Sequence, residues 1–144
     1  MMSDDWYTKE QLHFAAQDGD LAKVKMLIES GYDVNAFDDA MFYTPLHYAA
    51  LGEHVEVIRY LLSAGADINA HHSASAGETP LGAVAQTCSV EIARVLMAAG
   101  ANPLIPGWMQ ISALHRASKR KKPEGRRVYE LLLRAAQERF HYKA

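Results

Sequence analysis

The residues best suited to chemistry in this chain are seven histidines and a single cysteine. His13, His47 and His115 could form a ligand set, because imidazole binds metal ions and exchanges protons near neutral pH. Each of the three closes the same four-residue segment, which recurs along the chain. Repetition at a near-constant interval places such rings in a row along a stack rather than around one point. We therefore expect a structural role for all three.

The pair His71–His72 and the thiol of Cys88 lack the neighbours that chemistry needs. Adjacent side chains diverge on an extended segment, and no carboxylate lies beside His71 or His72 in the sequence. A reactive cysteine needs a nearby base, and no histidine or lysine is close to Cys88 in the sequence. The sequence also has no glycine-rich phosphate loop and no HExxH motif. We expect no enzyme activity, no metal and no cofactor.

A segment that starts helices occurs four times, at residues 10–13, 44–47, 79–82 and 112–115. In all but the first copy a threonine or serine can cap the helix, because its hydroxyl accepts a hydrogen bond from a first-turn amide. Proline follows the threonine in two copies and is tolerated at the first helical position. A leucine and then a small or apolar residue follow at helical spacing, which predicts one narrow apolar face on each helix.

A second and more apolar helical pattern follows each of these segments. Gly31, Gly65 and Gly100 come three residues after three of the patterns, where a left-handed residue commonly ends a helix. Ala135 takes that position in the last copy, so we expect the final helix to continue through residues 135–140. Helices of about ten residues are not stable alone in water, and stacking between copies must supply the missing burial.

These motifs resemble the ankyrin repeat, a unit of about 33 residues with a T-P-L-H-x-A signature. Residues 44–49 read TPLHYA and match that signature fully, and residues 61–70, LLSAGADINA, resemble the end of the second helix with the turn that follows. The resemblance implies an all-α solenoid of stacked helix-turn-helix units with projecting β-turn or hairpin fingers. It implies a single domain over residues 1–144, with repeats at about 7–38, 39–73, 74–106 and 107–140, the first and last acting as caps.

The sequence departs from the family pattern at a few positions. The fingers are slightly long, and Gly82 stands where the motif has histidine. Glu53 and Cys88 occupy positions where glycine is usual, and the segment KRKKPEGRR adds about two residues between the last two helices. We expect these departures to change local geometry and to leave the fold intact.

The resemblance implies that a partner protein binds in the concave groove between the fingers and the exposed side of each first helix, without catalysis. Aromatic and methionine side chains at finger tips are unusual unless they pack on something, so they either anchor a partner or cover neighbouring fingers. The expected partner-binding residues are Asp18, Phe37, Asp38, Asp39, Met41, Phe42, Tyr43, Leu51, His71, His72, Gln86, Trp108, Met109, Lys119 and Arg120.

Charge is distributed unevenly along the chain. Residues 1–114 carry 5 basic and 14 acidic side chains, a net charge of −9, and residues 115–144 carry 10 basic and 3 acidic, a net charge of +7. This polarity would orient a partner, with its basic part facing Asp18, Asp38 and Asp39 and its acidic part facing Lys119 and Arg120. An alternative is a nucleic-acid or anionic-surface binder that works through residues 119–127.

Composition bounds the setting in which the chain works. The apolar fraction of 49% and the charged fraction of 22% are ordinary for a soluble globular protein. One cysteine permits no internal disulfide, and the first residues, MMSDDWYTKE, lack the apolar core of a secretion signal. We expect a cytoplasmic monomer that does not span a membrane.

Overall fold

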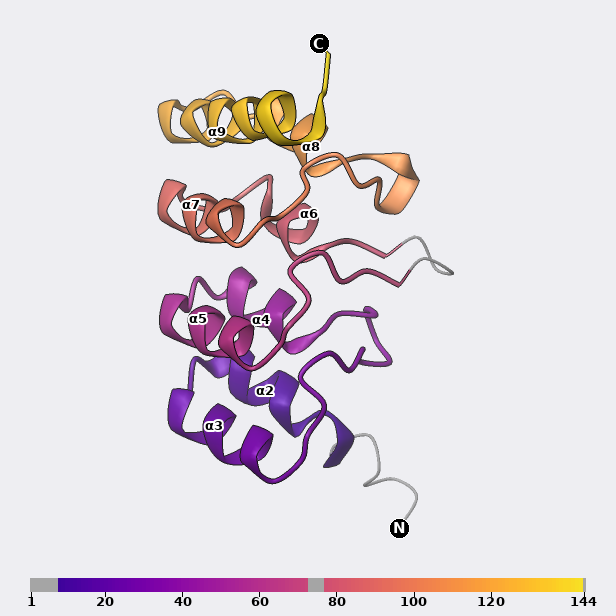
Figure 1. Cartoon of the computed structure of the whole chain (residues 1–144), viewed down its shortest axis with the longest axis vertical. Helices are drawn as coiled ribbons and strands as arrows, with labels where there is room; N and C mark the ends of the chain where they lie inside the picture. The colour runs from indigo at the N-terminus through magenta and orange to yellow at the C-terminus, as the bar shows by residue number, and fades with distance from the viewer. Residues whose placement is uncertain (1–7, 73–76, 144) are drawn as a thin grey trace.

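Helix pairs stacked along one axis form the architecture of the chain in a computed structural model, which describes residues 8–72 and 77–143 (Figure 1). The first helices of the pairs are α2 (Gln11–Asp18), α4 (Pro45–Leu51), α6 (Pro80–Val84) and α8 (Ala113–Ser118). The second helices are α3 (Leu21–Glu29), α5 (Val55–Ser63), α7 (Val90–Ala98) and α9 (Pro123–Phe140). Each first helix contacts the next first helix along the stack. The predicted all-α fold of stacked helix pairs is confirmed.

Loops between successive helix pairs project on the side of the first helices that faces away from the second helices (Figure 1). We call them fingers and name them by their residues: finger 36–43, finger 70–79, of which residues 73–76 lie outside the described part, and finger 104–111. Finger 104–111 contains the short 3-10 helix η3 (Trp108–Gln110). At its base Pro106 and Ser112 form an isolated antiparallel bridge. No helix in the described residues is long and apolar enough to cross a membrane.

The helices begin and end for local reasons that the sequence contains. Thr79 and Ser112 each accept a hydrogen bond from the backbone amide three residues later, as predicted for N-caps. Gly31, Gly65 and Gly100 have φ angles of +106°, +101° and +93°, a conformation that disfavours any residue with a Cβ atom. Where glycine is missing, the last helix does continue to Phe140.

The core is one continuous apolar cluster that extends along the stack, from Leu12 in α2 to Ala136 in α9. Small residues of the first helices, such as Ala16 and Ala49, are completely buried, so neighbouring helices approach closely. Val57 and Ile92 of the second helices are also buried. Second helices contact one another along the stack, as α3 contacts α5 and α7 contacts α9.

Two asparagines connect consecutive repeats through both ends of the side-chain amide. The Oδ1 atom of Asn69 accepts the Asn102 amide at 2.7 Å, and its Nδ2 atom donates to the Gly100 carbonyl at 3.4 Å. Asn35 makes the same pair of bonds one repeat earlier. Asn102 instead accepts the Leu104 amide within its own loop. These bonds fix the distance between one helix C-terminus and the next, which keeps the array in register.

Replacing Asn69 by alanine should lower the free energy of unfolding by about 1–3 kcal/mol, because it removes an acceptor and a donor from one inter-repeat contact. The Asn102→Ala variant is the matched control, since the Asn102 side chain bonds only within its own loop. Urea denaturation of both variants measures the difference. Equal losses would show that the bonds between repeats add nothing beyond a local turn.

Candidate functional site

The candidate site is the surface formed by the three fingers and the exposed ends of the first helices. Leu51, Gln86 and Lys119 are exposed at the ends of three of these helices, and Asp18 is exposed at the end of α2. The structure thus brings most of the predicted partner-binding residues to one side of the array. The exceptions are Asp38 and Arg120, whose side chains bond to groups within the protein.

Asp38 is one of these exceptions, and its predicted place on the partner-facing surface is wrong because the residue is buried. Only 4% of the residue is exposed, and its Oδ1 atom accepts the backbone amides of Met41 and Tyr43 at 3.2 and 2.9 Å. Its Oδ2 atom accepts a hydrogen bond from the Tyr48 hydroxyl. Burial and this contact raise the pKa of Tyr48. Asp38 closes finger 36–43 because two of the finger's amides need a buried acceptor. The next residue, Asp39, remains exposed.

Three rings form a contact between finger 36–43 and finger 70–79. The Phe42 ring stacks on His72 with centroids 4.5 Å apart, and Phe37 meets His72 edge-on at 5.4 Å. Both phenylalanines keep 37% of their surface exposed. These aromatic residues therefore cover a neighbouring finger, as one of the two predicted alternatives states, and part of each side chain remains exposed. Nδ1 of His71 lies 2.9 Å from the Asn69 carbonyl.

Finger 104–111 presents a different surface, because two large apolar side chains at its tip project into solvent. Trp108 is 63% exposed and Met109 is 65% exposed, and no aromatic ring in the described residues packs on the indole. Met109 and Gln110 have φ angles of +58° and +60°. Left-handed geometry costs roughly 1–2 kcal/mol at each residue that has a Cβ atom. Strain of this kind persists only where surrounding contacts impose it, and it often marks a functional site.

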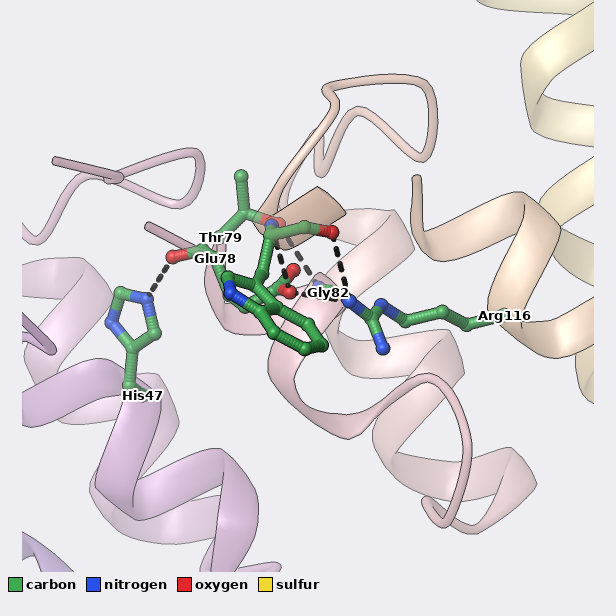
Figure 2. Close-up of polar contacts among 6 residues, drawn as sticks. His47, Glu78, Thr79, Gly82 and Arg116 are labelled. Carbon is green, nitrogen blue, oxygen red and sulfur yellow. Dashed lines mark hydrogen bonds and ion pairs between the residues drawn. The ribbon is translucent and has the colours of Figure 1, made fainter. Parts of the chain in front are cut away.

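Glu78, which precedes helix α6, supplies contacts to this finger from another part of the stack. Its Oε2 atom accepts the Trp108 amide at 3.1 Å and an Nη2 hydrogen bond from Arg116 at 2.6 Å. Arg116 also donates to the Trp108 carbonyl at 3.4 Å. On the other side the Glu78 carbonyl accepts a hydrogen bond from His47 at 2.6 Å. Figure 2 shows His47 and Arg116 on opposite sides of Glu78, which thereby connects three repeats.

Glu78 also explains why residue 82 is glycine in place of the histidine of the motif. A Cβ atom at Gly82 would lie 2.6 Å from Oε1 of Glu78, so the carboxylate occupies the space beside this helix. A Cβ atom at Gly107 would collide with the same oxygen. Neither Glu78 nor Arg116 was among the predicted site residues. The missing histidine at Gly82, next to an acidic residue before the cap, is the sequence signal that could have identified them.

The three histidines of the repeated segment lie in different environments. Nδ1 of His47 accepts the Thr44 amide at 3.0 Å, so the ring proton is on Nε2, which donates to the Glu78 carbonyl. Burial lowers the pKa of His47 to about 4 and keeps the ring neutral. His13 is buried with Nε2 2.7 Å from the Ala36 carbonyl, whereas His115 is exposed. Two of the rings thus connect a helix to the following finger.

Cys88 is buried, and some residues of the basic segment 119–127 make contacts within the protein. Burial raises the pKa of the Cys88 thiol to about 11, which keeps it protonated at neutral pH. Arg120 was predicted to face a partner in the groove. Its guanidinium instead donates a hydrogen bond to the Cys88 carbonyl at 2.8 Å. Arg126 lies over the Tyr129 ring at 5.0 Å. Lys119, Lys121, Lys122 and Arg127 remain exposed.

Comparison with known protein families adds independent support for the fold. The family described as ankyrin repeats (many copies) matches residues 12–62 and 46–97, which together span 86 of the 144 residues. The chain therefore belongs to the ankyrin-repeat family. A search of curated proteins found no match. Ankyrin repeats are generally protein-interaction modules, and the family is typically non-catalytic. Helices α8 and α9 lie beyond the matched residues.

Acidification should weaken the fold through His47. Its pKa is about 4 in the folded protein and about 6.5 in an unfolded chain, so the unfolded chain takes up the proton first as the pH falls. The stability from neutral His47 is complete above pH 6.5 and is lost between pH 6.5 and 4, by about 3 kcal/mol at most. Urea denaturation across this range measures the loss. This loss of stability on acidification should be smaller in His47→Gln and unchanged in the exposed control His115→Gln. Equal losses in both variants would contradict the role of His47.

The two neighbouring aspartates should respond differently to substitution. Asp38→Ala leaves two buried amides without their acceptor and should lower the free energy of unfolding by about 1–3 kcal/mol. Asp39→Ala removes an exposed carboxylate and should change it by less than about 0.5 kcal/mol. Thermal or urea denaturation distinguishes the two, and equal small effects would mean that Asp38 does not hold finger 36–43 closed.

Proposed function

We propose that this protein binds a partner protein through the finger surface and carries out no chemistry of its own. The observation that carries the proposal is the tip of finger 104–111, where Trp108 and Met109 project into solvent while backbone hydrogen bonds hold the finger. Large apolar side chains on a fixed backbone are the usual anchors of protein interfaces, because little conformational entropy is lost when they are buried.

The shape of this tip indicates the kind of surface that it fits. Two adjacent side chains on a projecting loop are covered on all sides only if the partner surrounds them. A folded partner with an apolar recess does this, whereas an extended peptide covers one side at a time. We therefore propose a folded partner whose recess receives Trp108, with Phe42 and Leu51 making additional contacts along the array.

Charge supplies orientation in this proposal. Asp18 and Asp39 are exposed toward the acidic end of the array, and Lys119 is exposed toward its basic end. A partner with the complementary polarity would be attracted in one direction along the fingers, which raises the association rate more than the final affinity. Asp38 and Arg120 make no direct contact with the partner in this proposal, because their charged groups bond to neutral groups of the fold.

The proposed mechanism is docking by a scaffold that is already in its binding geometry. The stacked repeats fix the fingers before a partner arrives, so association orders few additional residues. By occupying the partner's recess, a single copy of the chain in the cytoplasm would block other contacts there or bring the partner into an assembly.

Removing the proposed anchor should weaken binding without unfolding the protein. The partner is first isolated by affinity capture from the native host and purified, and its affinity is then measured by calorimetry. Trp108→Ala should weaken binding by about 1–3 kcal/mol, which is roughly ten- to a hundredfold. Met26→Ala is the matched control, because Met26 is a similarly exposed apolar residue on α3, away from the fingers. Equal affinities for the two variants would refute the finger tip as anchor.

A further inference from the structure

We infer that Glu78 and Arg116 are positioning residues for the tip of finger 104–111: they hold Trp108 and Met109 in a binding-ready geometry in the free protein. The inference rests on the proposed function, since it assigns these two residues a part in the same interaction. They do so without presenting their own side chains to a partner, because their side chains are only 13% and 15% exposed.

The first step is that both backbone polar groups of Trp108 are bound from outside the finger. Its amide donates to the Glu78 carboxylate and its carbonyl accepts from the Arg116 guanidinium. Glu78 lies at the end of finger 70–79 and Arg116 lies in helix α8, and the two side chains also bond to each other. A charged acceptor and a charged donor make stronger hydrogen bonds than neutral groups do. The bond between Glu78 and Arg116 is partly buried, and the two bonds to the Trp108 backbone lie at the exposed surface. The residue that carries the indole is thereby fixed at its backbone.

The second step is that the tip needs such a constraint. Met109 and Gln110 are consecutive residues in left-handed geometry, which relaxes when nothing holds the chain. Within the finger, the Gln110 amide donates to the Gly107 carbonyl and the Ile111 amide donates to the Trp108 carbonyl. These local bonds close the turn, but they do not fix its direction relative to the array. The bonds from Glu78 and Arg116 do, because both side chains belong to other segments of the stack.

The third step is that neighbouring residues make room for this pair. Gly82 and Gly107 lie directly against Oε1 of Glu78, and a methyl group at either position would displace the carboxylate. The Glu78 backbone is held from the other side by His47. The surroundings of the carboxylate are therefore arranged so that it points at Trp108.

The experiment uses the full chain with Trp6→Phe, so that Trp108 is the only tryptophan. Glu78→Ala should make exchange of the Trp108 amide roughly ten- to a hundredfold faster and lower the fluorescence anisotropy of the indole. Glu78→Gln keeps an acceptor and should show a smaller change. Glu53→Ala is the matched control, because Glu53 accepts the Ser89 amide of the next repeat at 2.8 Å, away from the finger.

A second variant leaves both Glu78 and Arg116 unsubstituted. Gly82→Ala adds one methyl group that pushes the carboxylate away from Trp108, while alanine in a helix favours the global fold. Exchange of the Trp108 amide should therefore become faster while the midpoint of urea denaturation is not lowered. If Glu78 only stabilised the fold, faster exchange would come with a lower midpoint. Unchanged exchange of the Trp108 amide in both Glu78→Ala and Gly82→Ala would overturn the inference.

The isolated partner then separates the two proposals. Glu78→Ala retains every side chain of the tip and should weaken binding at least threefold. If Trp108→Ala weakens binding but Glu78→Ala does not, the positioning role is wrong and the proposed function stands. If Trp108→Ala has no effect, the proposed anchor is wrong, and amide exchange alone decides whether Glu78 orders the tip.

Discussion

Burial between neighbouring repeats is the constraint on which this structure depends. Each repeat consists of two short helices, and neither helix can remove enough apolar surface from water without the next pair. The small residues Ala16 and Ala49 allow that close approach, and Asn35 and Asn69 fix its register through bonds to the following turn. Because every repeat packs against its neighbours, the positions of the loops between repeats are set by the stacked helices. The fingers are therefore ordered by packing that lies outside them.

Finger 104–111 shows how a local departure from the repeat pattern can fix a loop more firmly. Where the motif has histidine, this chain has Gly82, and the vacated space holds the Glu78 carboxylate. The carboxylate pairs with Arg116 and reaches the backbone of the next finger. In the preceding repeat, His47 makes a comparable contact, a hydrogen bond from its ring to the Glu78 carbonyl. A histidine and a glutamate thus connect the start of a first helix to the neighbouring finger in two successive repeats.

The charged residues divide into those that hold the fold and those that remain available to a partner. Asp38, Glu78, Arg116 and Arg120 bind internal groups, whereas Asp18, Asp39 and Lys119 are exposed. The charge asymmetry of the sequence is real, but several of its members do not contribute to the surface that a partner meets. Glu78 and Arg116 form an ion pair and largely cancel each other, so the exposed charges are the ones that a partner can contact directly.

Local sequence patterns were enough to predict the repeats, the helix starts at Thr79 and Ser112, the glycine stops and the extended last helix. These features follow from backbone preferences that act over a few residues. The burial of Asp38 beside an exposed Asp39, and the contacts of Glu78 with Trp108 and Arg116, became visible only in the folded chain. Those contacts join residues 30 or more positions apart or depend on how one loop closes. Side-chain direction in such a loop is set by neighbouring repeats, and no periodicity in the sequence encodes it.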